Sequence, residues 1–563
     1  MKRIEGKPLP VGVTIGKDSV NFSIAVPERK TCQLLLYKAG EITPTYTFEL
    51  KEEDAFGEMR FIALEGLETK KYEYNYEIDG EVVLDPYVKE IAGKSIWGEK
   101  KDLSGHEIRG KLTESEYDWE GDRRLQIPAN EVIAYALHVR GFTKHSSSQV
   151  RGKGTFKGLA EKIAYLKELG INQIQCMPVY EFEEVLEEQI NYWGYGPAYY
   201  FAPKAAYASG KSAVKEFKDM IKACHSAGIE VVLDMAFEED VPLQMMDECL
   251  RYYMLEYHVD GFILNPERVP ITMFRKDPLL KAVKILERQD GFSNCMRRFL
   301  KGDEGCVGEA MWHLRHLSSR KGIYNYLTSH NGFTLNDLVS YDHKHNEENK
   351  EENQDGTDYN FSWNCGVEGP SRKKEVVKLR KKQMKNAFAI LLLSQGTPCI
   401  LAGDEFANSQ KGNNNAYCQD NAISWLNWKN LEKEKELFAF VKELIAFRKQ
   451  YGILHPKMEA KGMDQTSCGF PDISYHGESA WRVPDEYSSR ELGIYYCGQE
   501  VKEYIFVAYN MHWIEHEFAL PTLPKGRKWH LCMQTSEVEL PEAIQNAKEI
   551  AIEGRSIAIL IGK

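Results

Sequence analysis

The sequence predicts an α/β protein in which a (β/α)8 TIM barrel lies between an N-terminal and a C-terminal β-sandwich domain. Short alternating apolar runs fill the first 90 residues, strand-like and helical runs alternate from 131 to 451, and strand-like runs return beyond 461. At roughly 150 residues per domain, the 563 residues suffice for three or four domains. We expect the domains to span 1–120, 121–455 and 456–563.

The N-terminal segment has the period of a half-buried antiparallel sheet. Residues 11–87 contain the runs VNFSIAV, TCQLLLYK, TYTFEL and YEYNYEI, separated by clusters of Gly, Lys, Asp and Glu. Alternation with frequent turns predicts a small β-sandwich. Residues 100–130 are charged and unpatterned, so we expect a linker there.

The pattern changes at Glu131. The strand-like runs VIAYALHV, INQIQCMPV and IEVVLDM alternate with the helical runs GLAEKIAYLKELG and SAVKEFKDMIKACHSAG. This rhythm predicts βαβ units with a parallel sheet, and seven or eight such units close a barrel. It ends near Tyr451, and beyond Lys461 the runs GIYYCG, YIFVAYN and SIAILIG predict a second β-domain.

Charge and composition restrict the partners. The 72 Lys and Arg residues against 84 Asp and Glu residues give a net charge of −12, which argues against nucleic acid and anionic membrane surfaces. Aromatic residues make up 11% of the chain and suit stacking on flat ligands such as sugars. The first ten residues have no apolar run, and no segment approaches the roughly 20 apolar residues of a membrane span, so we expect a cytoplasmic protein.

The cysteines indicate a reducing compartment. All twelve are scattered, with no CxxC pair, which is typical of buried thiols in a cytosolic protein. We therefore expect no disulfide, no metal site and no cofactor.

Several stretches of the chain carry recognisable motifs: HVRGFT at 138–143, GTFKGL at 154–159, YLKELG at 165–170, NYWGY at 191–195, FAP at 201–203, and the runs 329–357 and 391–428. Together they resemble the isoamylase and glycogen-debranching branch of glycoside hydrolase family 13 in the α-amylase clan. The N-terminal sandwich resembles the carbohydrate-binding module that precedes such barrels. Residues 473–477 and 510–513 resemble the family's C-terminal domain.

The resemblance implies hydrolysis of α-1,6 branch points by two carboxyl groups, which a retaining glycosidase holds about 5 to 5.5 Å apart. The family's nucleophile is the Asp of a Gly-Phe-Arg-x-Asp strand end. Here Ile263 occupies the Arg position and Asn265 the nucleophile position. A neutral amide cannot form the ester intermediate, and no guanidinium favours an anion there.

Two further family positions differ. The third acidic residue follows His in the family, whereas Asn331 follows His330 here. After the third strand the family pattern D-V-V-x-N-H becomes DMAFEE at 234–239, so that Glu238 replaces the Asn and Glu239 the sugar-binding His. A hydrogen-bond donor has thereby become an acceptor.

The general acid has to be placed by its context. The run 277–290 best matches the family segment and puts Arg288 at the acid position, with Glu287 on the opposite face of the strand. The loop that normally follows is shortened. Glu309 is a possible substitute, but it follows RRFLKGDEG, which precedes a helix beyond the family's sixth strand, so we interpret it as structural.

Some sugar-binding positions are retained. Tyr195 lies where the family stacks an aromatic ring on the sugar, although simple loop packing is the alternative. His330 lies where an imidazole bonds to sugar hydroxyls. The predicted substrate-binding residues are Trp193, Tyr195, Asp234 and His330.

Other conspicuous side chains have simpler explanations. The histidines of the His343-Lys344-His345 triplet match ordinary family loop sequence, so we expect no metal there, and Asp404 and Glu405 match a structural turn.

Three functional hypotheses follow. The first is a non-catalytic glucan-binding or regulatory protein that binds an α-glucan or maltooligosaccharide and has an active debranching paralogue as a possible protein partner. The second is a debranching hydrolase that uses displaced acids, such as Glu238 or Glu239 with Glu287. The third is a structural or interaction protein with a vestigial sugar site.

Overall fold

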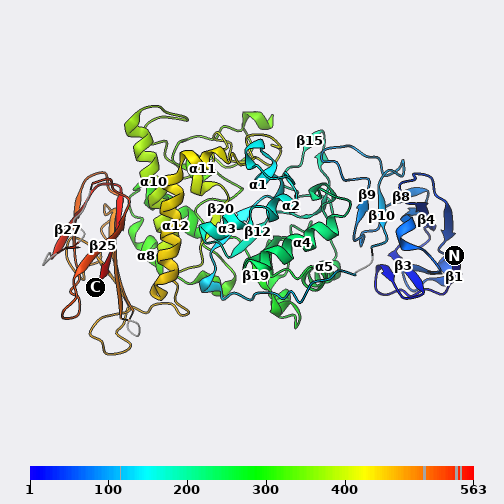
Figure 1. The fold of residues 1–563 in the computed structure, drawn as a ribbon, viewed down its shortest axis with the longest axis horizontal. Coiled ribbons are helices and arrows are strands. Elements are labelled where there is room, and N and C mark those ends of the chain that lie inside the picture. The colour runs from blue at the N-terminus through cyan, green and yellow to red at the C-terminus, as the bar shows by residue number, and fades with distance from the viewer. Residues whose placement is uncertain (114–115, 499–501, 539–542, 545–547) are drawn as a thin grey trace. The chain divides into compact units, whose positions relative to one another are not determined.

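The computed structural model describes residues 1–113, 116–498, 502–538, 543–544 and 548–563. Its internal contacts divide the chain into two units. The first comprises Met1–Leu125, His138–Ile163 and Cys176–Ile285, and the second comprises Gln126–Leu137, Ala164–Gln175 and Leu286–Lys563. Antiparallel strands occupy both ends of the chain, and helices alternate with parallel strands in the middle (Figure 1).

The N-terminal strands form two antiparallel sheets, in the orders β1-β6-β3-β2 and β5-β4-β7-β10-β9, with β8 paired to β7. The strands are β1 Lys2–Ile4, β2 Gly12–Ile15, β3 Ser19–Ala25, β4 Cys32–Lys38, β5 Tyr46–Glu49, β6 Met59–Glu65, β7 Tyr72–Ile78, β8 Glu81–Val83, β9 Ile91–Ala92 and β10 Arg109–Lys111. The alternate residues Val20, Phe22 and Ile24 of β3 enter the shared core. The two-residue period of the sequence therefore predicted the sandwich correctly, because alternate side chains of the strand point into its core.

Three parallel strands lie in the order β19-β18-β17. The strands β17 (Glu230–Asp234) and β18 (Gly261–Ile263) belong to the first unit, and β19 (Lys284–Leu286) ends at Leu286, where the second unit resumes. Asp234 pairs with Ile263 at the carboxyl ends of β17 and β18. The strand β17 is buried along its whole length, as expected of a parallel strand covered on both faces. Helix α4 (Ala213–Ser226) leads into β17, and α5 (Leu243–Glu256) connects β17 to β18.

The second unit contains the strand order β12-β11-β20: β11 Ala134–Leu137, β12 Gln173–Cys176 and β20 Cys399–Leu401. The register of β11 on β20 is parallel. Helix α3 (Ile163–Leu169) connects β11 to β12, and α10 (Lys374–Leu393) leads into β20. Helix α12 (Lys435–Gln450) packs alongside α10 (Figure 1).

A seventh strand position follows β19 in the second unit. Ile323 forms an isolated parallel bridge with Glu287, and Asn325 forms another with Pro398. Between Leu286 and Ile323 the described residues form two consecutive helices, α7 (Gly291–Lys301) and α8 (Val307–Arg315), without a strand between them. The barrel is present as predicted, and at this point two helices replace strict strand–helix alternation.

The C-terminal strands also form two antiparallel sheets, in the orders β21-β22-β23-β28-β25-β26 and β24-β27. The strands are β21 Ile473–His476, β22 Glu491–Gly498, β23 Glu503–Asn510, β24 His516–Ala519, β25 Trp529–Gln534, β26 Ala543–Ile544, β27 Glu549–Ile552 and β28 Ser556–Gly562. Tyr495, Phe506, Phe518 and Leu560 lie in their core. This second β-domain completes the predicted fold class.

Short elements connect these layers. They are α1 Val139–Lys144, α2 Phe156–Ala160, α6 Ile271–Phe274, α9 Leu335–Leu338, α11 Lys429–Lys433, β13 Tyr180–Phe182, β14 Val185–Leu186, β15 Gln189–Ile190 and β16 Ala198–Pro203. All twelve cysteines are free, and most are buried. Within the described residues, every helix is too short or too polar to span a bilayer.

Candidate functional site

The NYWGY loop of the first unit is fixed by its own amide side chain. The Nδ2 of Asn191 donates to the carbonyls of Glu183 and Tyr195 at 2.9 and 2.7 Å, and its Oδ1 accepts from the Gly194 N–H at 3.1 Å. Gly194 has φ +86°, and any Cβ there would collide with the ring of Phe182. These contacts hold the loop backbone in one conformation, which sets the directions of the Trp193 and Tyr195 side chains.

Three predicted substrate-binding residues meet at the carboxyl end of β17. The Tyr195 hydroxyl donates to Asp234 Oδ2 at 3.1 Å, and Asp234 is 6% exposed. The ring of Trp193 packs edge-on against that of Tyr195, with 6.1 Å between centroids. In barrels of this kind, the carboxyl ends of the strands carry the binding site.

His138, at the start of α1, supports the same loop. Its Nδ1 accepts from the Gly141 N–H at 3.0 Å, so the neutral ring carries its proton on Nε2. That Nε2 donates to the Tyr192 carbonyl at 2.8 Å, and the Tyr207 hydroxyl lies 3.2 Å away. The HVRGFT motif was recognisable in the sequence, but this bond between distant segments was not.

Asn265, at the predicted nucleophile position, stabilises a turn. Asn265 is exposed just after β18; its Oδ1 accepts from the Glu267 N–H at 3.0 Å, and its carbonyl accepts from the N–H groups of Arg268 and Val269. Ile263, at the predicted Arg position, is 4% exposed. The local chemistry at this strand end is thus an amide capping a turn beside a buried aliphatic side chain.

Both displaced acids beside β17 contact one cation. The Arg268 Nη1 lies 3.6 Å from a Glu238 oxygen and 3.2 Å from a Glu239 oxygen. Arg268 follows β18, so this ion pair joins the loops after two neighbouring strands. Each candidate acid therefore contacts the same guanidinium.

The strand end after β19 belongs to the second unit. Glu287 donates its backbone N–H to Gly322, and its side chain accepts from Gln289 at 3.3 Å. Arg288 lies near Tyr326, whose pKa is raised mainly by burial and also by Asp290, while Arg288 acts to lower it. The Tyr326 hydroxyl donates to Asp290 at 2.5 Å. Asp290, which the sequence analysis did not single out, is the carboxylate fixed here.

The segment after the seventh strand position holds His330 and Asn331. His330 is half-buried, and Asn331 is exposed, with its carbonyl accepting from the Ser329 hydroxyl at 3.0 Å. The described contacts assign no sugar-facing role to either side chain. Their predicted roles therefore stay predictions, as does that of Arg288.

Asp404 and Glu405 have the contacts of structural residues, in line with the prediction. Asp404 accepts from the Leu335 N–H at 2.9 Å and from the Thr328 hydroxyl, and Glu405 accepts from the hydroxyls of Tyr135 and Tyr165. Burial raises the pKa of Asp404 to about 7. Hydrogen-bonded in this way, both carboxyl groups hold the turn after β20 together.

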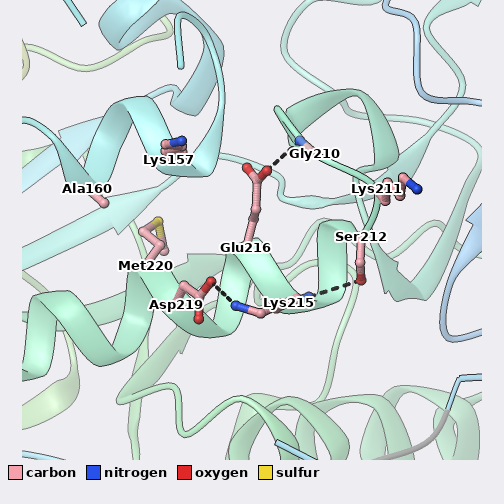
Figure 2. A pocket seen from close by; sticks show the side chains of 9 residues that line it. All are labelled: Lys157, Ala160, Gly210, Lys211, Ser212, Lys215, Glu216, Asp219 and Met220. Carbon is pink, nitrogen blue, oxygen red and sulfur yellow. Dashed lines mark hydrogen bonds and ion pairs between the residues drawn. The ribbon is translucent and has the colours of Figure 1, made fainter. Parts of the chain in front are cut away.

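A cavity of about 440 Å³ lies beside the N-terminus of α4 and is lined by none of the predicted site residues. Figure 2 shows its lining side chains: Lys157, Ala160, Gly210, Lys211, Ser212, Lys215, Glu216, Asp219 and Met220. Glu216 accepts from the Ser209 and Gly210 N–H groups, Ser212 caps the helix, and Lys215 pairs with Asp219 at 2.7 Å. These polar groups satisfy one another, as helix-capping residues do.

Several known proteins are similar to this chain in sequence. The family model "Alpha amylase, catalytic domain" matches residues 140–240. Isoamylase 1, chloroplastic, of Arabidopsis thaliana is 30% identical over 95% of this chain and 85% of its own length. The glycogen operon protein GlgX homolog of Haemophilus influenzae is 33% identical over 70% of this chain and 77% of its own length.

The chain belongs to the isoamylase group of glycoside hydrolase family 13. The alignment with the Arabidopsis isoamylase spans 679 residues, more than this chain contains, so the relative has insertions that this chain lacks. Solved structures share the fold. Pullulanase type I from Bacillus subtilis, complexed with maltose, has a TM-score of 0.75 at 19% identity over 98% of this chain and 85% of its own. The catalytic module of pneumococcal SpuA has a TM-score of 0.76 at 16% identity over 99% and 98%.

Proposed function

We propose that this isoamylase-family chain binds α-glucan without cleaving it. The observation that carries the proposal is the chemistry after β18, where the exposed amide of Asn265 caps a turn and a buried Ile263 lies at the position that the resemblance assigns to an arginine. A glycosidase of this type needs a carboxylate nucleophile and a carboxylic acid on either side of the bond. An amide supplies neither.

We infer that the second catalytic group is also absent from its expected place. Arg288 follows β19, and α7 and α8 then follow each other with no strand between them. This supports the absence of a proton donor, because the loops at strand ends carry the catalytic groups of such barrels.

The displaced-acid hydrolase is the rival proposal, and the names of the isoamylase relatives favour it. It requires one of Glu238 and Glu239 to act with Glu287. Arg268 contacts both glutamates, but a surface ion pair of this kind costs only about 0 to 1 kcal/mol to break, so the activity assay below decides between the two proposals.

Glucan binding is supported by the site that remains. Tyr195 supplies an aromatic ring that packs against the largely buried Trp193, and Asp234 supplies a carboxylate that can accept from sugar hydroxyls. Pullulanase structures are titled as complexes with maltose and with maltohexaose and α-cyclodextrin. We propose the same ligand class here, with His330 as a further contact.

The wider setting is part of the proposal. We propose domains at 1–120, 121–455 and 456–563, a cytoplasmic location, and regulation through an active debranching paralogue. The name of the Arabidopsis relative places that protein in the chloroplast, and the name of the Haemophilus relative assigns that protein to a glycogen operon.

Isothermal titration with maltohexaose and glycogen tests the proposal. Binding by the intact chain that Tyr195→Ala weakens supports it, provided that Tyr359→Ala, at an exposed site in the second unit, binds normally. Absence of binding to every glucan would favour a purely structural or interaction role. Reducing-end release from pullulan that disappears in Glu239→Gln would establish the displaced-acid hydrolase instead.

A further inference from the structure

Helices α7 and α8 bring together three side chains with metal-binding chemistry. The ligand atoms of Cys295 on α7 and of Glu309 and His313 on α8 all lie within 4.8 Å of one another. A Glu309 oxygen lies 3.7 Å from His313 Nε2, and the Cys295 thiol shares a hydrogen bond with Glu309. Residues four apart on a helix lie on one face, so Glu309 and His313 are directed to the same point.

The surroundings hold the two softer ligands in place. Cys295 is 2% exposed, and the His313 side chain is 12% exposed. The rings of Phe292 and Trp312 pack edge-on against the imidazole, at centroid distances of 5.9 and 4.6 Å. The Glu309 side chain, in contrast, is 54% exposed. It lies on the solvent side, where an ion would enter.

We propose that Cys295, Glu309 and His313 bind one Zn²⁺ ion. Thiolate, imidazole and carboxylate are the zinc ligands of proteins, and the thiolate disfavours Mg²⁺ and Ca²⁺. One thiolate and one carboxylate balance the two charges of the ion, so the partly apolar pocket holds no net charge. Three protein ligands leave the fourth tetrahedral position to water.

The distances fit after a small adjustment. Zn–S bonds of about 2.3 Å and Zn–N and Zn–O bonds of about 2.0 to 2.2 Å place neighbouring tetrahedral ligands roughly 3.4 to 3.6 Å apart. The observed 3.7 Å between Glu309 and His313 is close to this spacing. The Cys295 and His313 ligand atoms lie within 4.8 Å of each other, and a small side-chain rotation of either residue supplies the remaining movement of about 1 Å.

The ion would join two helices that replace a strand–helix unit of the barrel. Cys295 lies on α7 and the other two ligands on α8, so Zn²⁺ would tie together the stretch that leads from β19 to Ile323. A ligand that binds only the folded chain stabilises it by mass action. The sequence predicts no zinc site, because its cysteines form no CxxC pair and these ligands are spaced 14 and 4 residues apart.

Titration of the metal-free full-length chain tests the site, with ZnCl₂ followed by calorimetry and CoCl₂ followed by thiolate-to-cobalt charge-transfer absorption. We expect one ion per chain. Cys295→Ser should abolish the charge-transfer band and weaken Zn²⁺ binding at least about tenfold, because even outer-shell partners are worth roughly 10- to 100-fold. Cys468→Ser, which removes an exposed thiol, is the matched control and should bind as the wild type does.

Equal Zn²⁺ affinity in the wild type, Cys295→Ser and His313→Gln would overturn the proposal, as would no binding at all. Should Cys295→Ser fail to fold, as judged by circular dichroism, Glu309→Gln decides the matter, since its side chain is largely exposed. Unchanged affinity in a folded Glu309→Gln chain would also contradict the three-ligand site.

Discussion

The Tyr195 hydroxyl donates a 3.1 Å hydrogen bond to Asp234, the last residue of β17. This bond joins the NYWGY loop to the carboxyl end of a barrel strand and fixes the plane of the tyrosine ring. The two residues are 39 positions apart, so only the fold brings them together.

Two substitutions separate stacking from hydrogen bonding at Tyr195. Tyr195→Ala removes the ring and should weaken maltohexaose binding by about 1 to 3 kcal/mol, the value of a buried aromatic contact. Tyr195→Phe keeps the ring and should cost only about 0.5 to 1.5 kcal/mol, the net value of one hydrogen bond. Calorimetric Kd values measure both. Equal losses in the two variants would show that the ring itself does not contact the sugar.

Restoring one family residue should not restore catalysis. Asn265→Asp keeps the oxygen that caps the turn on Glu267, so we expect unfolding free energy within about 0.5 kcal/mol of the wild type. We also expect no gain in reducing-end release from pullulan, because Arg288 stands at the predicted acid position after β19, and the neighbouring Glu287 and Asp290 accept hydrogen bonds from Gln289 and Tyr326. A measurable gain would mean that a proton donor is already in place.

The Arg268 ion pair should matter little to stability. Its partners are exposed, with the Glu239 side chain at 80%, and surface pairs are worth about 0 to 1 kcal/mol. Arg268→Gln should therefore shift the urea midpoint only slightly. The same variant frees Glu238 and Glu239, so glucan cleavage that appears in Arg268→Gln alone would identify them as latent acids.

Asp404 should give stability an unusual pH dependence. Burial raises its pKa from 3.8 to about 7, with smaller upward effects from Glu405 and Asp337, so the folded chain holds a proton that the unfolded chain has lost. Because the folded pKa is the higher one, this contribution is full below about pH 4 and is lost as the pH rises toward 7.

Asp404→Asn keeps the side-chain shape and removes the titration. Between pH 4 and 7 we expect the unfolding free energy of Asp404→Asn to fall less steeply with pH than that of the wild type. The two slopes should differ by on the order of 1 kcal/mol per pH unit. Asp358→Asn, at an exposed carboxyl group, is the control. Denaturation curves at pH 4, 5.5 and 7 measure the slope, and an unchanged slope in Asp404→Asn would rule out this assignment.

The sequence allowed the fold class to be predicted, because its evidence is local. The alternation of Val20, Phe22 and Ile24 indicates a half-buried strand, and the apolar run of β17 indicates a strand covered on both faces. The NYWGY motif likewise marked the loop that carries Trp193 and Tyr195.

Other features depend on contacts between distant segments. The sequence did not predict that two consecutive helices, α7 and α8, follow β19. The run 277–290 has the apolar pattern of a strand whichever barrel position it occupies. The pairing of Arg268 with Glu238 and Glu239 joins two loops through side chains about 30 residues apart. The triplet of Cys295, Glu309 and His313 is likewise assembled only when two helices pack.

Reducing-end release from pullulan and glycogen by the purified full-length chain, at the protein concentration that binds maltohexaose in calorimetry, tests the central claim most directly. A glucan-binding protein without catalytic carboxyl groups should release no more sugar than the buffer blank. Sustained turnover at the rate of a debranching enzyme would contradict it.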